Sequence, residues 1–149
     1  MEVPMKSVLV SWQFWTLLSA TFAALTAIFA KVGIEQINSD FATFIRTVVI
    51  LFVLGGILIG SGQWQAPTSV SGRTYLFLVL SGLATGASWL CYFRALKLGD
   101  AARVAPLDKL SVVLVALFGV LFLGEKLTMP NWIGIALIAS GAVLVAYKA

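Results

Sequence analysis

Four charged residues lie inside or near the ends of long apolar stretches of this sequence: Arg46, Arg94, Asp108 and Lys109. A charge at the centre of a bilayer costs roughly 3 kcal/mol, so such a residue persists where it is paired, faces water or reaches the interface. Arg94 lies three residues before Lys97, near the end of its apolar stretch, and we expect its side chain to extend to the membrane surface. Arg46 lies one to two turns into its apolar stretch, where either a structural or a functional role is open.

Asp108 and Lys109 follow Pro106 inside an apolar stretch. Adjacent residues point about 100° apart on a helix, so the two need not pair with each other, and one can face a cavity while the other faces a neighbouring helix. Structural pairing stays open, but we favour a functional interpretation. Arg46 and Lys109 would suit a carboxylate or another anionic group, and Asp108 would serve as a coupling or structural carboxylate.

Polar side chains recur at helical spacing in the same stretches. Ser81, Thr85, Ser88 and Tyr92 are spaced by 4, 3 and 4 residues, which places them on one helix face. The alternative is that each hydroxyl only bonds back to its own helix backbone. If the stripes instead line a polar path, the candidate pathway residues are Ser19, Arg46, Thr85, Ser88, Tyr92, Asp108, Lys109 and Ser111.

The elements that position these residues follow from composition. The 149 residues are 60% hydrophobic and 11% charged, with a mean hydropathy of +1.02. A soluble domain is nearer a quarter charged, so the apolar surface of this chain must face lipid. Runs of about 20 apolar residues span a bilayer as helices. We expect one domain over residues 1–149, an all-α integral membrane bundle with helices at about 8–33, 40–60, 74–97, 101–123 and 130–147.

The same composition argues against several other functions. There is no His and a single Cys, Cys91, so neither a disulfide within the chain nor a Cys/His zinc site is available. The ten Lys and Arg are scattered rather than clustered, which favours membrane topology over nucleic-acid binding. No carboxylate pair or nucleophile–base spacing is present, so an enzyme acting on lipid ranks last. We expect no enzyme activity and no cofactor.

Small residues are spaced so that helices can approach closely in lipid. The expected packing positions are Gly56, Gly60, Gly82, Gly86, Ala136 and Ser140. In the last helix Ser140 is almost the only polar residue. We therefore expect the first four helices to surround a polar cavity and the fifth to be peripheral.

Five helices place the two ends of the chain on opposite sides of the membrane. The charges outside the helices are nearly balanced, with Lys6, Arg73 and Lys126 on one side and Lys31, Lys97, Arg103 and Lys148 on the other. Such a chain can insert in both orientations and form an antiparallel dimer. If Arg46, Arg94 and Lys109 are counted as well, the positive-inside rule instead places the amino terminus outside.

The region from Tyr92 to Ser111 resembles the EamA family of the drug/metabolite transporter superfamily, in its single-repeat, five-helix form. The run YFRALKLGDAARVAP continues as LDKLS, and LGEKL follows at Leu123–Leu127. Arg46 matches an arginine usual in the second helix of the family, and Lys31 matches the basic end of the first. The resemblance covers essentially the whole chain, and it identifies the family rather than a substrate.

This resemblance implies a secondary transporter or exporter of small metabolites, with several passes through the cell (inner) membrane. Longer relatives fuse two inverted repeats into ten helices, so one repeat implies half a transporter, completed by a homodimer or by a paired gene product. The first four helices of each repeat would surround a central pathway at the midplane. The alternative is a non-transporting membrane subunit that pairs with and modulates another membrane protein.

Overall fold

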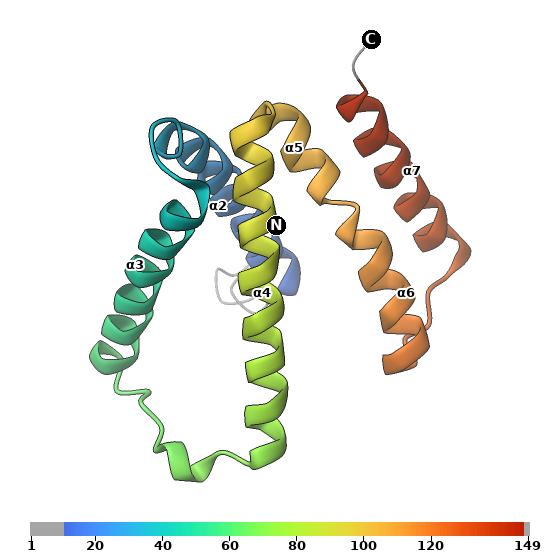
Figure 1. Ribbon diagram of the computed structural model, residues 1–149. Coiled ribbons are helices and arrows are strands. Elements are labelled where there is room, and N and C mark those ends of the chain that lie inside the picture. Colours follow the sequence, from blue (N-terminus) through green and yellow to red (C-terminus); the bar gives the residue numbers. More distant parts are fainter. Residues whose placement is uncertain (1–10, 148–149) are drawn as a thin grey trace, which may run out of the picture.

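A computed structural model describes residues 11–147, and no strand occurs among them. The helices are α2 (Trp12–Gly33), α3 (Ser39–Gly60), α4 (Gly72–Leu98), α5 (Ala101–Asp108), α6 (Ser111–Leu123) and α7 (Met129–Ala146), with a short 3₁₀ helix, η1 (Pro67–Ser69), before α4 (Figure 1). Five of these segments are long and apolar enough to cross a membrane if α5 and α6 count as one span, Ala101–Leu123. The expected all-α membrane bundle is confirmed, while the expected helical positions 8–10 lie outside the described residues.

Local sequence signals set where several helices begin and end. The Asn38 side chain accepts hydrogen bonds from the N–H groups of Asp40 and Phe41 at 2.8 and 3.2 Å, which starts α3. The Ser71 hydroxyl accepts one from the N–H of Thr74 at 3.2 Å, which starts α4. At the end of α6, Gly124 has a φ of +69°, the left-handed conformation that a glycine adopts without steric cost.

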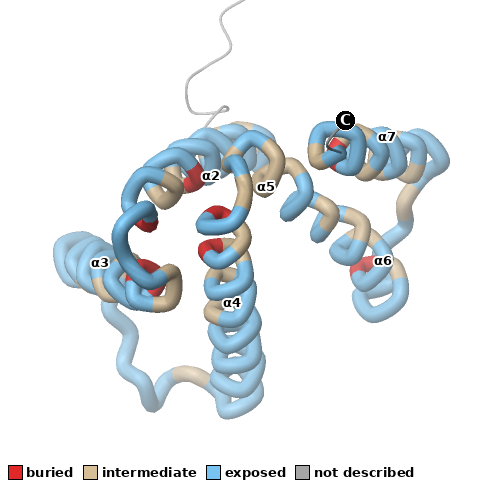
Figure 2. Tube along the Cα trace, turned by 45° about the horizontal axis from the view of Figure 1, so that its top comes forward, coloured by how far each residue is buried: buried red, intermediate tan, exposed pale blue. Residues whose placement is uncertain are grey.

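The helices are tightly packed only near one end of the molecule. In Figure 1, α3 and α4 lie close together at the end where α2 turns into α3, and they diverge towards the loop that carries η1. The residues of the small core are Ile34, Ala42, Phe93 and Leu96, at the junction of α2, α3 and α4 (Figure 2). Helix α7 packs against α5 and α6 at the edge of the bundle.

In this splayed arrangement, four of the small residues expected at helix contacts face open space within the chain. A Cβ atom added at Gly56, Gly60, Gly82 or Gly86 would meet no neighbouring atom within 4 Å. These glycines lie where α3 and α4 have separated. They therefore make no close helix contact within the chain. In α7 the Ser140 hydroxyl donates to the Ala136 carbonyl at 2.8 Å, a bond within its own helix.

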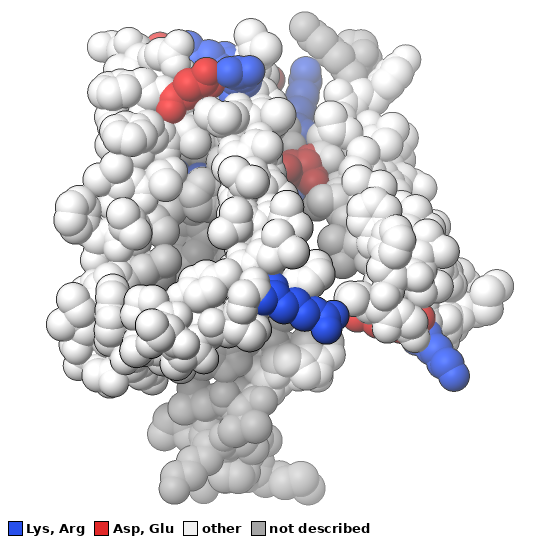
Figure 3. Space-filling view, turned by 60° about the horizontal axis from the view of Figure 1, so that its bottom comes forward, with Lys and Arg blue, Asp and Glu red and all other residues white. Residues whose placement is uncertain are grey.

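Most of the remaining surface is apolar. Leu98 is 89% exposed and Phe122 is 77% exposed, although both belong to spanning helices. Figure 3 shows one face on which uncharged side chains dominate and charged ones gather in a few places. Such a surface is stable only against lipid or a second protein.

Two lysines join the ends of α2 and α4. The Lys31 ammonium donates to the carbonyls of Leu96 and Gly99, at 2.8 and 2.9 Å. In return, the Lys97 ammonium donates to the carbonyls of Ile34, Glu35 and Ile37, at 2.6, 3.0 and 2.8 Å. The carbonyls at a helix end lack partners within the helix and carry partial negative charge, so each lysine stabilises the end of the other helix.

Arg94 binds a carboxylate at the start of α3. Its Nε and Nη2 atoms donate to Oδ1 and Oδ2 of Asp40 at 3.0 and 2.6 Å. This paired geometry joins α4 to the first turn of α3. The bond fixes how the two helices approach near the core, so Arg94 has a structural role in the fold.

Candidate functional site

The fourth span is interrupted next to the charged pair. After α5 ends at Asp108, Lys109 and Leu110 form a tighter turn. The N–H groups of Lys109 and Leu110 donate to Pro106 and Leu107, three residues back, at 3.0 and 3.1 Å, instead of the usual four. Interrupted spans of this kind form the ion and solute sites of many transporters.

A polar cavity of about 180 Å³ opens beside this break. It is lined by Ala23 and Thr26 of α2, Arg46 of α3, Ser88, Trp89 and Tyr92 of α4, and Asp108 and Lys109. Five candidate pathway residues from three different spans thus lie around one space. The α-helical periodicity brings Ser88 and Tyr92 to the same side of α4, four residues apart.

Asp108 and Lys109 do not divide between a cavity and a neighbouring helix. Both line the polar cavity, and the Lys109 ammonium lies 3.4 Å from an Asp108 carboxylate oxygen. The turn at Lys109 releases the two side chains from the 100° separation of a regular helix. The pair is partly exposed to the cavity, so each partner can also interact with a solute.

Arg46 is held by aromatic rings. Its guanidinium carbon lies 4.0 Å from the centre of the Trp89 ring and 5.3 Å from that of Phe93. Cation–π contacts of this kind orient a guanidinium without neutralising it. No carboxylate and no hydrogen-bond acceptor within residues 11–147 binds Arg46. The site therefore holds a positive charge whose counter-charge the described chain does not supply.

Trp89 was not among the predicted pathway residues, although it lines the polar cavity. An aromatic residue in an apolar run is usually explained by contact with lipid, so the residue type carries no signal of its own. Its position is the available signal, because Trp89 lies between Ser88 and Tyr92 on the polar stripe.

A second cavity of about 460 Å³ adjoins the first between α2 and α5. Ala23, Tyr92 and Lys109 line both, and Ser19 joins Thr16 and several alanines on the α2 side. No α7 residue lines either space. Ser19 therefore faces a space between α2 and α5, and its role in a solute path stays a prediction.

Two candidate residues lie elsewhere. The Thr85 hydroxyl donates to the Ser81 carbonyl at 2.9 Å, so it bonds back to its own helix. Ser111 begins α6 and is exposed. Neither residue lines the cavities described in this section. The polar stripe on α4 therefore reaches the site only through its Ser88 and Tyr92 end.

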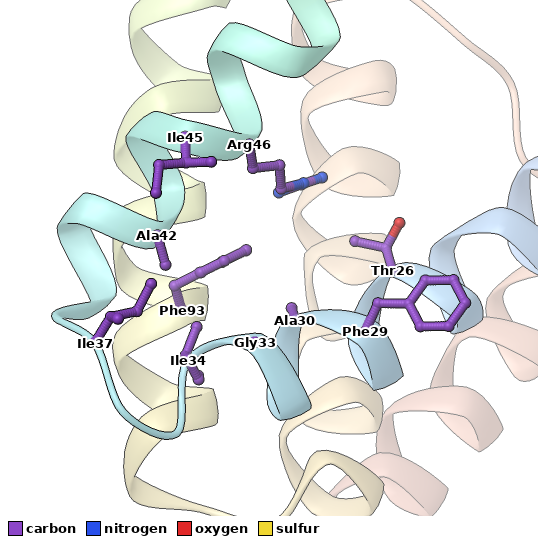
Figure 4. Close-up of a pocket in the computed structure, with 10 residues that line it drawn as sticks. All are labelled: Thr26, Phe29, Ala30, Gly33, Ile34, Ile37, Ala42, Ile45, Arg46 and Phe93. Atoms are coloured by element: carbon purple, nitrogen blue, oxygen red, sulfur yellow. The ribbon is translucent and has the colours of Figure 1, made fainter.

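A third space, which we call the α2–α3 pocket, measures about 360 Å³ and is mainly apolar. Its walls include Phe29, Ile34, Ile37, Ala42, Ile45 and Phe93. Figure 4 shows Thr26 and Arg46 pointing towards one another from α2 and α3. These two residues also line the polar cavity, so they form the boundary between the two spaces.

The chain is similar to known membrane transporters. The model of the EamA-like transporter family matches residues 10–147. An uncharacterized transporter in the cobO 3′ region of a Sinorhizobium species is 75% identical over 136 residues, which cover 91% of this chain and 96% of that protein. No solved structure matches the chain.

Two further relatives carry more specific names. A riboflavin transporter of Rhizobium johnstonii is 32% identical over 113 residues, which cover 76% of this chain but 35% of that protein. A probable 4-amino-4-deoxy-L-arabinose-phosphoundecaprenol flippase subunit, ArnE, of Yersinia pestis is 29% identical over 85 residues, which cover 56% of this chain and 75% of that protein.

Proposed function

The chain belongs to the EamA-like transporter family, and from this we propose that it is a secondary transporter or exporter of small metabolites that works as a dimer. The observation that carries the proposal is the polar cavity, where Arg46, Asp108 and Lys109 meet beside an interrupted span. Charges are retained inside spanning segments chiefly where solutes or ions pass. The proposed location is the cell (inner) membrane.

We assign distinct roles to the charged residues of the cavity. Arg46 and Lys109 hold an anionic or zwitterionic group of the solute, and Asp108 is a coupling or structural carboxylate. Because Asp108 lies 3.4 Å from Lys109, an arriving anion would compete with it for the lysine. Ser19, Ser88 and Tyr92 line the path with hydroxyl groups that can replace water around the solute.

The dimer is supported by surfaces that one copy leaves open. The glycine faces of α3 and α4 meet no neighbour within the chain, and close helix packing in lipid uses such faces. In our proposal a second copy, inserted in the opposite orientation, covers these faces and closes the central pathway at the midplane. Transporters commonly build such sites between inverted repeats.

A second candidate function follows from one relative. ArnE is named as a flippase subunit, so this chain would instead pair with a different membrane protein and modulate it. Purified protein in liposomes separates the two proposals. A transporter moves solute alone, whereas a modulating subunit moves none until its partner is added.

The test measures the uptake of labelled solutes into proteoliposomes. The two probes are riboflavin and 4-phenylbutane-1-sulfonate, and the sulfonate group of the second is ionised throughout the pH range of the assay. We expect Asp108→Asn and Lys109→Met each to lower uptake at least tenfold. Asp100→Asn and Lys126→Met are the matched controls, since both residues lie outside the cavity. Unchanged uptake in the two cavity variants would refute their assigned roles.

A further inference from the structure

The α2–α3 pocket is unsuited to a fully polar metabolite. Its five large apolar side chains are Phe29, Ile34, Ile37, Ile45 and Phe93. At about 360 Å³ the pocket is within the size range of small-molecule sites, roughly 300–1,000 Å³. Apolar groups bind such a surface because they leave water, while polar groups lose their hydration there.

The pocket is continuous with the polar cavity through shared residues. Thr26 and Arg46 line both spaces, and Figure 4 shows their side chains converging between α2 and α3. A ligand at this boundary has a cation and a hydroxyl on one side and hydrocarbon on the other. The two spaces therefore suit the two halves of one molecule.

Arg46 is the cation at this boundary that lacks a counter-charge. In the described chain, Lys109 has Asp108 at 3.4 Å and Arg94 has Asp40 at 2.6 Å. Arg46 has the rings of Trp89 and Phe93, whose faces leave its charge in place. A partly buried charge without a counter-ion is costly, and a bound anion removes that cost.

We infer that the solute is an amphipathic anion, with its charged group at Arg46 and its apolar part in the α2–α3 pocket. This inference rests on the proposed transport function and narrows its substrate class. The competing occupant is an acyl chain of the bilayer. An acyl chain would fill the hydrocarbon half but leave Arg46 without its anion, so the charge favours the solute.

The experiment measures equilibrium binding to the purified protein in nanodiscs with three matched probes. 4-Phenylbutane-1-sulfonate has both the anion and the apolar ring. Butane-1-sulfonate has the anion without the ring, and 4-phenylbutan-1-ol has the ring without the anion. We expect the first probe to bind at least about tenfold more tightly than either of the others, since ring burial adds to ion pairing. Arg46→Gln should weaken 4-phenylbutane-1-sulfonate to about the level of the alcohol, and it should reduce butane-1-sulfonate, which has no ring, to a still weaker level.

Variants that fill the pocket test its occupant. A Cβ atom at Gly33 or Gly134 meets no neighbour within 4 Å, but only Gly33 lines the pocket. Gly33→Leu should therefore weaken 4-phenylbutane-1-sulfonate at least fivefold and leave butane-1-sulfonate unchanged, while Gly134→Leu changes neither. Ile45→Trp, which fills the pocket from α3, repeats the test at an exposed position.

The outcomes distinguish the anion site at Arg46 from the apolar part of the proposed site. If both sulfonates bind equally and depend on Arg46, while the fillers have no effect, the anion site stands and the amphipathic inference is wrong. If Arg46→Gln leaves both sulfonates unchanged, the role of Arg46 in the proposed function is wrong as well. If Gly33→Leu lowers only the amount of co-purified phospholipid, the pocket belongs to the bilayer and the inference is overturned.

Discussion

Lys31 and Lys97 each donate hydrogen bonds to carbonyls at or just after the carboxyl-terminal end of the helix that carries the other lysine. Lys31 on α2 binds the Leu96 and Gly99 carbonyls at the end of α4, and Lys97 on α4 binds three carbonyls that follow α2. The exchange ties the two helices together beside the small core. Residues of α2 and α4 also line the polar cavity.

We expect Lys97→Met to lower the free energy of unfolding by about 1–3 kcal/mol, because three carbonyls lose a charged donor. Thermal unfolding of the purified protein in detergent measures the effect. Lys97→Arg should recover part of the loss, since a guanidinium still donates to carbonyls. Lys126→Met, in the exposed α6–α7 loop, is the control. Equal melting temperatures for the Lys97 and Lys126 variants would contradict the capping role.

Arg94 and Asp40 should be coupled in a double-mutant cycle. Arg94→Gln and Asp40→Asn each remove the same pair of hydrogen bonds, so the double variant should unfold at nearly the temperature of either single variant. The side chains are 60% and 43% exposed, so the coupling should be small and should weaken at high salt. Purely additive shifts in melting temperature at low salt would show that the pair contributes nothing.

Gly124, at the end of α6, should tolerate replacement less well than Gly134 in α7. At φ +69° an L side chain is strained, and Gly124→Ala should destabilise the protein by about 1 kcal/mol. Gly134→Ala is the comparison, because this α7 glycine has no neighbour within 4 Å and has no positive φ. We expect that change to be neutral or slightly stabilising in the same unfolding assay. The reverse order would refute the left-handed turn.

The spans were predictable because length and hydropathy suffice to identify them. Among the eight pathway residues predicted from charge and hydroxyl spacing were the five that line the polar cavity, Arg46, Ser88, Tyr92, Asp108 and Lys109. The break at Lys109 was not predicted, because a proline near a helix start, such as Pro106, predicts an intact helix beyond it. Nor was the mutual capping by lysines, since a basic residue at a helix end is equally well explained by membrane topology.

The proposed antiparallel dimer predicts that each loop is present on both sides of the membrane. In a Cys91→Ser background, Gln36→Cys in the α2–α3 link and Gln63→Cys after α3 should each react with an impermeant maleimide in about half of the molecules. Both positions are exposed and lie at opposite ends of α3. Labelling of one position in all molecules and of the other in none would establish a single orientation and overturn the antiparallel arrangement.

Trp89 should control solute affinity by positioning Arg46. Its ring centre lies 4.0 Å from the guanidinium carbon, and a cation–π contact of this kind contributes about 0.5–2 kcal/mol. Trp89→Ala should therefore raise the KM for 4-phenylbutane-1-sulfonate about threefold to tenfold in proteoliposomes, with a smaller change in maximal rate. Trp89→Phe should recover most of the affinity, because a phenyl ring still offers its face. In an Arg46→Gln background the Trp89→Ala change should have no further effect on KM, since the cation it positions is gone. An equal loss in both backgrounds would mean that Trp89 acts on the solute or the fold directly, and not through Arg46.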